Sequence, residues 1–269
     1  MGLLPVPQPY DFERSLDRFT FWGVDRANVW HDGGLHRVIA GREVRIAPAK
    51  GGVLVEPLDD VTEPVVRKLL GLEQDVPSFQ VFARGDSVLA ETVRRYPGFR
   101  PPLAPDPFEA LVSSITAQQV SLHSAFAVRS RLIDRFGEPA ALAVAFPTRE
   151  RVARAREEEL TELGFSRRKA EYVLGLARSD LDFEALAVLP DHEIKARITA
   201  LRGLGEWSAD WFLARHLARP EAWPAGDLGL RKAVLAFYPD VEDIRAAGER
   251  FRPFQNLTAH YLLLALRHP

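Results

Sequence analysis

A proline-rich stretch at residues 96–105 divides the chain into two parts with different hydrophobic patterns. Its four prolines leave little room for a helix or a strand, because proline fixes φ and has no N–H to donate. Before this stretch the pattern is mostly that of strands, whereas after it apolar residues recur at helical spacing. The sequence therefore predicts an α+β fold, with a small β-rich N-terminal domain and two mostly helical domains.

The first part contains two hairpin signals and one clear helix. The hairpins are centred on the Asp-Gly pair within residues 29–39 and on Lys50-Gly51-Gly52, which lies between strands at 43–46 and 53–55. The helix is expected to start at Thr62, as its cap, and to end at Gly71.

The second part is predicted to be almost wholly helical. Asp106 is placed to cap its first helix, with Pro107 at the first helical position. Further helices are expected near 122–136, 149–163, 167–178, 191–201, 207–218, 228–237 and 254–267. We expect three domains: 1–85, 106–220, and a discontinuous one made of 86–105 and 221–269.

Composition excludes several kinds of chemistry. The chain has no cysteine, so it has no disulfide, thiolate zinc site or cysteine nucleophile, and its seven histidines show no metal-ligand spacing. The net charge is −2, so any DNA-binding surface must come from a local basic face and from backbone amides. The chain shows no membrane-length apolar run, no secretory pattern and no sign of oligomerisation, so we expect a cytoplasmic monomer.

The most informative segment is 201–211, where Gly203 and Gly205 make a tight turn between two helices. Glycine permits a positive φ and the close approach of another backbone. The second helix begins near Ser208, and its unpaired N-terminal amides can hold a phosphate without reading base sequence. The ordinary alternative is a helix–turn–helix connection with no binding role.

Asp227 follows a Pro/Gly-containing loop and opens an apolar helix. The ordinary interpretation is an N-cap, which contributes about 1 kcal/mol to stability. A cap also fixes a carboxylate at the mouth of a helix, so a structural and a catalytic role are compatible.

The order of these segments resembles the helix-hairpin-helix DNA glycosylases that carry a Gly/Pro-rich loop and a catalytic Asp. Other motifs resemble the bacterial DNA-3-methyladenine glycosylase II group in particular, and they occur in the same order along nearly the whole chain. They are Pro9-Tyr10-Asp11-Phe12, Phe108-Glu109-Ala110-Leu111-Val112 with Gln118-Gln119-Val120-Ser121, and Arg252-Pro253-Phe254.

This resemblance implies an enzyme that extrudes an alkylated base from double-stranded DNA and hydrolyses its N-glycosidic bond, with Asp227 as the catalytic carboxylate. Bifunctional members carry a lysine nucleophile just after the hairpin turn, where this chain has Trp207. The resemblance therefore implies a monofunctional glycosylase that leaves an abasic site and requires no cofactor.

An aromatic base pocket is also implied, because an extruded base stacks on aromatic rings and a cationic base is attracted to them. The resemblance places Trp207, Trp211 and Phe19 around it. Two further pocket positions depart from the family pattern, because Leu228 and Leu263 stand where enterobacterial-type members have aromatic residues. We expect a less stacked and wider pocket that accepts bulkier alkylated bases.

Two further roles are predicted for DNA binding. Leu103, in the proline-rich connector, is the candidate wedge that fills the gap left by the extruded base. The backbone carbonyls of Thr199, Leu201 and Leu204 are candidates for a structural monovalent cation at the hairpin, on the resemblance alone. The basic run 167–169 is interpreted as a solvated helix N-terminus.

Three alternatives remain open from the sequence. A glycosylase of this fold could act on deaminated or mismatched bases, although these neutral bases need help in leaving that the sequence does not reveal. A non-catalytic damage-binding protein would keep the hairpin without needing Asp227. A lyase is the third, and Trp207 argues against it.

Overall fold

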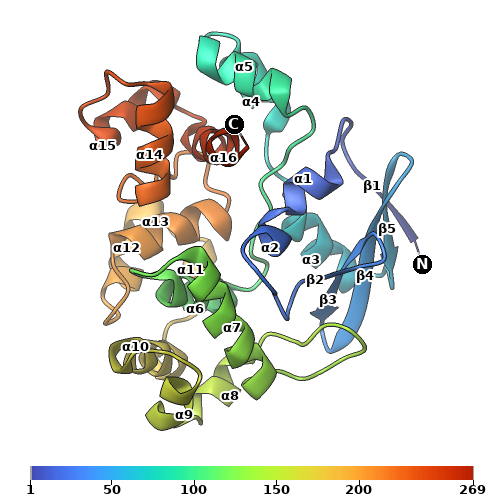
Figure 1. The fold of residues 1–269 in the computed structure, drawn as a ribbon, viewed down its shortest axis with the longest axis vertical. Coiled ribbons are helices and arrows are strands. Elements are labelled where there is room, and N and C mark those ends of the chain that lie inside the picture. Colours follow the sequence, from blue (N-terminus) through green and yellow to red (C-terminus); the bar gives the residue numbers. More distant parts are fainter. Residues whose placement is uncertain (1, 269) are drawn as a thin grey trace.

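The computed structural model describes residues 2–268 and shows a small β-sheet beside two groups of helices (Figure 1). The predicted α+β class is confirmed. In Figure 1 the sheet lies on one side, and the C-terminal helix α16 (Gln255–Arg267) lies next to α14 (Leu228–Phe237).

The sheet has five antiparallel strands in the order β1-β5-β4-β3-β2. These strands are β1 (Gly2–Pro5), β2 (Val29–His31), β3 (Gly34–Ile39), β4 (Arg42–Ala49) and β5 (Gly52–Glu56). Both predicted hairpins are present, and positive φ values at Asp32, Gly33 and Gly51 make their turns. Strand β1 was not predicted; it is a short edge strand that depends on pairing with β5.

Helices make up most of the remaining chain. Those of the first hundred residues are α1 (Phe12–Leu16), α2 (Arg18–Phe21), α3 (Thr62–Leu69), α4 (Val76–Ala83) and α5 (Ser87–Arg95). The central ones are α6 (Pro107–Ala117), α7 (Leu122–Phe136), α8 (Arg149–Ala153), α9 (Glu157–Glu162), α10 (Arg167–Arg178), α11 (Phe183–Ala187), α12 (Asp191–Thr199) and α13 (Glu206–Arg215). The last are α14 (Leu228–Phe237), α15 (Ile244–Ala247), the 3-10 helix η1 (Gly248–Phe251) and α16 (Gln255–Arg267).

Two helix predictions differ from the structure. The segment 149–163 forms α8 and α9 rather than one helix, and α9 begins anew at Arg156, whose backbone N–H donates to the Glu159 carboxylate at 3.0 Å. Thr62 is not the cap of α3, because it is buried in the first turn and its N–H donates to Asp59 Oδ1 at 2.9 Å. The carboxylate before the helix therefore takes the capping role.

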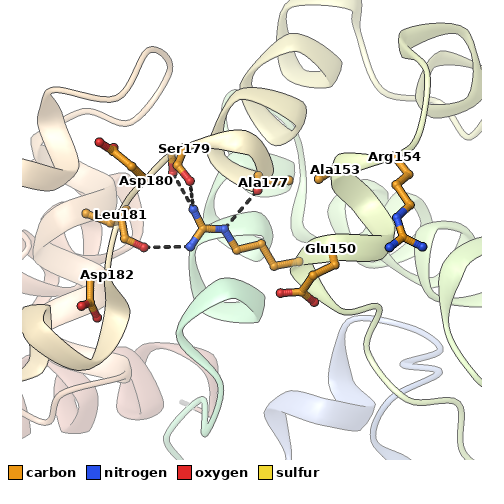
Figure 2. A pocket seen from close by; sticks show the side chains of 9 residues that line it. Glu150, Ala153, Arg154, Ala177, Ser179, Asp180, Leu181 and Asp182 are labelled. Carbon is orange, nitrogen blue, oxygen red and sulfur yellow. Dashed lines mark hydrogen bonds between the residues drawn. The ribbon is translucent and has the colours of Figure 1, made fainter.

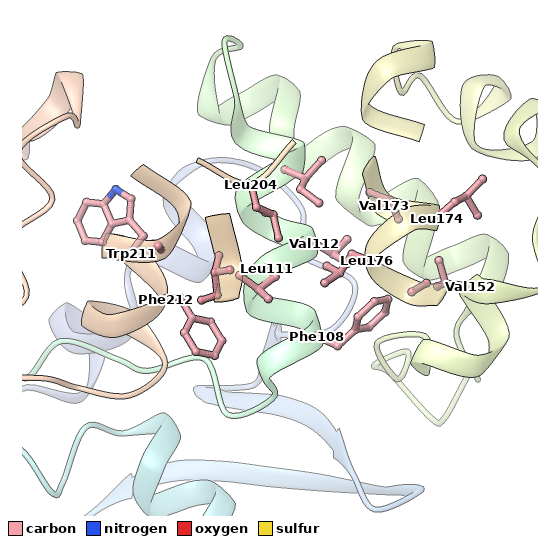
Figure 3. Packing of buried hydrophobic residues seen from close by; sticks show 14 of the residues in the cluster. Phe108, Leu111, Val112, Val152, Val173, Leu174, Leu176, Leu204, Trp211 and Phe212 are labelled. Carbon is pink, nitrogen blue, oxygen red and sulfur yellow. The ribbon is translucent and has the colours of Figure 1, made fainter. Parts of the chain in front are cut away.

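The buried apolar residues form three main clusters. One unites the sheet with α1, α2 and α3; a second lies among the helices from α6 to α13; the third unites α4 and α5 with α14 and α16. The predicted boundary at residue 85 is therefore misplaced, since Val76 and Phe79 of α4 pack with the C-terminal helices. Figure 3 shows the second cluster, in which Phe212 points towards Leu111 of α6 while Trp211 points away from it.

Buried ion pairs fasten the N-terminal part to the central helices. Arg37 of β3 and Arg129 of α7 both bind Glu109 of α6, the Arg129 Nη2–Glu109 Oε1 distance being 2.5 Å. Arg129 also pairs with Asp25, and Arg37 donates to Asn28 at 2.9 Å. Every charge in this network has a partner of opposite sign, so the network fixes how the domains meet.

Among the described residues, no helix is long and apolar enough to cross a membrane.

Candidate functional site

Asp227 is the N-cap of α14, and its carboxylate is held by three donors. Oδ1 accepts from the Leu230 backbone N–H at 2.8 Å. Oδ2 accepts from the indole Nε1–H groups of Trp207 at 2.9 Å and Trp211 at 3.0 Å. A carboxylate offers about four lone-pair positions, so about one remains for another group. The arrangement fixes a half-buried anion at the mouth of a helix.

The two indoles come from one face of α13. Residues four apart on a helix lie on the same face, so Trp207 and Trp211 present their N–H groups to the same oxygen. Trp207 is half-buried, whereas only 4% of Trp211 is exposed. The structure thus brings three predicted site residues together, with both tryptophans acting as hydrogen-bond donors to the carboxylate.

Arg215 continues this face by one more turn. Its guanidinium carbon lies 3.4 Å from the Trp211 ring centroid, and the ring of His260 from α16 meets Trp211 edge-on at 5.7 Å. Burial, together with the positive charges of Arg18 and Arg267, holds the Arg215 pKa well below its usual range, although Asp227 opposes the shift. Burial and the positive charges of Arg215, Arg18 and Arg267 hold the pKa of His260 well below its usual range, so this imidazole is neutral at neutral pH.

The hairpin between α12 and α13 has the predicted glycine geometry. Gly203 has φ +88°, and a Cβ there would lie 2.0 Å from the Tyr172 ring, so no other residue fits. Gly205 caps α13 and lies open to solvent. Among the described residues none accepts a hydrogen bond from the Glu206 or Trp207 backbone N–H, which leaves these amides available to an anion.

Ser208 does not take part in this exposed surface. Only 1% of the residue is exposed, and its backbone N–H donates to the Gly205 carbonyl at 3.0 Å. The predicted phosphate contact at Ser208 is therefore contradicted, because α13 tightens in its first turn and encloses that residue. The free amides lie one and two positions earlier.

Thr199, Leu201 and Leu204 surround the same turn. Leu204 is buried, and its N–H donates to the Leu201 carbonyl at 3.1 Å. A carbonyl has a second lone pair, so this bond leaves Leu201 able to bind a cation. No cluster of His, Cys, Asp or Glu that could hold a metal ion occurs among the described residues.

The two predicted leucines lie at different depths. Leu228 is 74% exposed beside Asp227, so it stands at the rim and encloses nothing in the free protein. Leu263 of α16 is half-buried and lies closer to the carboxylate. A Cβ on Gly229 would sit 3.0 Å from Asp227 Oδ1 and 3.3 Å from Leu263 Cδ2, which places both at one spot.

Phe19 does not lie beside Asp227 and Leu263. It is 9% exposed and belongs to the core of the N-terminal domain. The N-terminal aromatics that reach other domains are Phe21 and Trp22: the Arg267 guanidinium of α16 lies 5.4 Å and 5.6 Å from their ring centroids. The helical register of α2 turns Phe19 inward and Phe21 outward, so the predicted pocket role of Phe19 is contradicted.

Leu103 is also placed differently from its prediction. Only 2% of it is exposed, and its N–H donates to the Leu69 carbonyl at 3.2 Å. A side chain in this position cannot enter a duplex without leaving the core, so the structure argues against the wedge role. Around Leu103 the proline-rich connector is buried, so it is not a surface loop.

The loop between α6 and α7 contains one of the motifs that resemble the glycosylase family, and the sequence predicts no separate role for it. Gln118 donates from Nε2 to the Gly203 carbonyl at 2.8 Å, which ties this loop to the hairpin. Gln119 is exposed with φ +53°, and Val120 next to it is 45% exposed. A non-glycine residue at positive φ is uncommon, and the polar pair after an apolar helix was the available sequence signal.

Two surface hollows lie apart from Asp227. One, of about 580 Å³, surrounds Arg149, whose guanidinium donates to the Ala177, Ser179 and Leu181 carbonyls (Figure 2). This arginine satisfies the carbonyls that end α10, which is a structural role. The other, of about 620 Å³, lies between α3 and the end of α13, and Leu103 and His216 line it.

Comparison with known proteins agrees with this geometry. The family described as "HhH-GPD superfamily base excision DNA repair protein" matches residues 112–250, which hold the hairpin and Asp227. A Bacillus subtilis protein named DNA-3-methyladenine glycosylase is 27% identical over 73% of this chain and 69% of its own length. A Mycobacterium tuberculosis protein named "Probable bifunctional transcriptional activator/DNA repair enzyme AlkA" is 28% identical over 99% of this chain, which spans 57% of that protein.

Solved structures show the same similarity over the whole fold. The 3-methyladenine DNA-glycosylase from Archaeoglobus fulgidus has a TM-score of 0.88 and 28% identity, and the match covers 99% of this chain and 98% of that one. An 8-oxoguanine glycosylase/lyase from Clostridium acetobutylicum, solved with double-stranded DNA, shares the fold at a TM-score of 0.82 and 19% identity. The chain therefore belongs to the HhH-GPD superfamily of base excision DNA repair proteins.

Proposed function

We propose that this chain is a monofunctional DNA glycosylase that removes alkylated bases from double-stranded DNA by hydrolysis of the N-glycosidic bond. The observation that carries the proposal is the pair of indole N–H groups that Trp207 and Trp211 direct at one oxygen of Asp227. Relatives at 27% and 28% identity, named for 3-methyladenine, support the alkylated-base substrate.

The carboxylate would stabilise the positive charge that develops at the sugar as the bond breaks. The base departs with the bonding electron pair, and water supplies the hydroxyl that adds to the anomeric carbon and releases a proton. An alkylated base that starts as a cation leaves as a neutral molecule, so it needs no proton donor. The free lone-pair position on Asp227 Oδ1 is available to the water.

Hydrolysis without strand cleavage is supported by Trp207. Its indole nitrogen donates to Asp227, and an indole cannot form a Schiff base. The nearby lysine on the preceding helix, Lys195, pairs with the buried Asp210 at 2.6 Å. The product would be an abasic site in an intact strand.

DNA binding would rest on the hairpin. The free amides of Glu206 and Trp207 suit a backbone phosphate. We assign the wedge to the exposed loop that holds Gln119 and Val120, because Gln118 anchors it to the hairpin. The Thr199, Leu201 and Leu204 carbonyls would hold a monovalent cation that steadies the turn. The protein is expected to act as a monomer and to require no other cofactor.

The base site is expected to be open. Leu228 stands at its rim and Leu263 lies near the carboxylate, so aliphatic side chains replace aromatic stacking there. This favours alkylated bases bulkier than 3-methyladenine alone. Release of only 3-methyladenine from a panel of lesions would contradict that breadth.

The test is base release from alkylated duplex DNA by the wild type and by Asp227→Asn. We expect free alkylated bases with the wild type only, and a strand that breaks only after alkali. Strand cleavage without alkali would indicate a lyase. Release of only deaminated or mismatched bases would show that these, and not alkylated bases, are the substrates. DNA binding without release of any base would indicate a damage-binding protein.

A further inference from the structure

We propose that Arg215 is a specificity-determining residue of the base site, and that its guanidinium donates to a carbonyl oxygen on the far edge of the extruded base. Alkylated bases with a carbonyl at that edge would then be favoured over those with an amino group there. The inference rests on the proposed function and adds to it how one alkylated base is distinguished from another.

The first observation is that the guanidinium of Arg215 lacks a hydrogen-bond partner. No hydrogen bond or ion pair joins this side chain to any of residues 2–268, and its buried Nε has no acceptor. Two other arginines that lie inside the protein, Arg149 and Arg129, are satisfied, because Arg149 donates to carbonyls and Arg129 to carboxylates. Buried polar groups almost always have partners, so a guanidinium with none indicates a ligand that is absent here.

A second unpartnered group lies beside it. His260 is 8% exposed, its Nε2 has no acceptor or donor, and its ring meets Trp211 edge-on. Arg215 and His260 come from different helices, α13 and α16, and converge on the same indole. Arg215 and His260 therefore place two side chains without hydrogen-bond partners beside one aromatic ring, which makes a polar site available to a ligand.

The location relative to Asp227 fits a nucleobase. The Trp211 indole donates to Asp227 at one end and carries the Arg215 guanidinium on its face. The carboxylate and the guanidinium thus contact the same indole, the carboxylate at its Nε1 edge and the guanidinium on its face. With the sugar at Asp227, the far edge of the base reaches Arg215.

The charge of the site decides which edge it accepts. A guanidinium has five N–H donors and no acceptor, so it can bind a carbonyl oxygen and cannot bind an amino group. The positive charges of Arg18 and Arg267 also act on it, although Arg267 itself pairs with Asp17 at 2.8 Å. An acceptor is therefore favoured there, and Asp227 alone faces the cationic sugar.

One simpler role must be distinguished. By stacking on Trp211, Arg215 could merely hold that indole against Asp227, as a positioning residue. Loss of such a clamp would slow the release of every base by the same factor. Loss of a recognition contact would instead change the ratio between bases, so the ratio is the decisive readout.

Methylated duplex DNA allows both kinds of base to be measured in one substrate, since it contains 7-methylguanine and 3-methyladenine. Both are cationic, but guanine carries a carbonyl O6 where adenine carries an amino group. We expect Arg215→Met to reduce release of 7-methylguanine about tenfold more than release of 3-methyladenine. Arg215→Lys keeps the positive charge but loses the planar guanidinium, so it should lower the ratio of 7-methylguanine to 3-methyladenine release by less than Arg215→Met does. If the Met variant does not fold, the Lys variant provides the test.

The control is Arg135→Met, which removes an arginine 6.0 Å from the Phe136 ring on the exposed part of α7. It should leave both the rates and the ratio unchanged. An unchanged ratio in both Arg215 variants would overturn the inference and leave the proposed function standing. Release of neither base by the wild type would overturn the proposed function, and the inference with it.

Discussion

Buried charges occur in two regions of this molecule, and the two regions treat them in opposite ways. At the interface of the N-terminal and central parts, Arg37 and Arg129 face Glu109 and Asp25, and each charge is paired. At the candidate site, Arg215 and His260 flank the Trp211 ring that donates to Asp227, and the side chain of Arg215 has no hydrogen-bond or ion-pair partner among the described residues.

The difference reflects the cost of burying charge. A buried ion is tolerated when its partners are in the protein, and such a network then fixes geometry. A buried ion without partners costs stability, and a folded protein retains it mainly where a ligand supplies the missing contacts. The interface is complete within the chain, whereas the site is completed only by a substrate.

The largest effect is expected at the interface. Glu109→Ala leaves Arg37 and Arg129 facing each other without a shared carboxylate, and breaking a buried pair typically costs about 3–5 kcal/mol. Urea unfolding of the purified protein would measure it. The control is Glu91→Ala, which removes an exposed ion pair with Arg94 and should change stability by less than about 1 kcal/mol. If the two substitutions lowered the free energy of unfolding equally, the buried ion pairs would not be what stabilises the interface.

The next effect is expected at the site, and on activity instead of stability. Asp227→Asn removes the charge but keeps a side chain that can cap α14, so we expect about 10²–10³-fold slower base release. Stability should fall by about 1 kcal/mol, because the amide cannot accept from the indoles and from Leu230 N–H at once. Full activity in this variant would remove Asp227 from catalysis.

A smaller effect is expected from Trp207→Phe. The substitution keeps an aromatic ring but removes one of the two indole donors to Asp227 Oδ2. A hydrogen bond to a charged group contributes about 1.5–3 kcal/mol, so we expect base release to slow about tenfold or more. The measurement is single-turnover excision with DNA binding as the control. Unchanged rates would mean that Trp211 alone orients the carboxylate.

The smallest effect is the acid dependence of stability. Burial raises the pKa of Glu109, but Arg37 and Arg129 outweigh it and hold the pKa below the usual range. Because the folded pKa is the lower one, this contribution is complete above the ordinary glutamate range and is lost as pH falls through the folded pKa. Urea unfolding from neutral to acid pH should show a steeper loss in the wild type than in Glu109→Gln. Parallel curves would contradict the assignment.

Local patterns allowed much of this structure to be predicted. The Asp-Gly hairpin, the helical second part, the hairpin glycines and the Asp227 cap all depend on contacts within a few residues. Two of the predictions that failed depend on contacts far along the chain. Leu103 is enclosed by the Leu69 backbone and by α13, and Phe19 turns into the N-terminal core.

By itself the sequence determined the two hairpins, the main helices and which residue types reach the turn at Gly203 and the loop before α14, because helix spacing, glycine and caps act locally. Only the tertiary structure decided that two indoles meet one carboxylate, and that Arg215 and His260 flank one of those indoles unsatisfied. Those contacts join α13, α14 and α16, whose separation along the chain is bridged by packing of apolar faces. Apolar periodicity shows which face of each helix is buried but not which helix that face packs against, so the charge balance of a site becomes visible only once the helices are assembled.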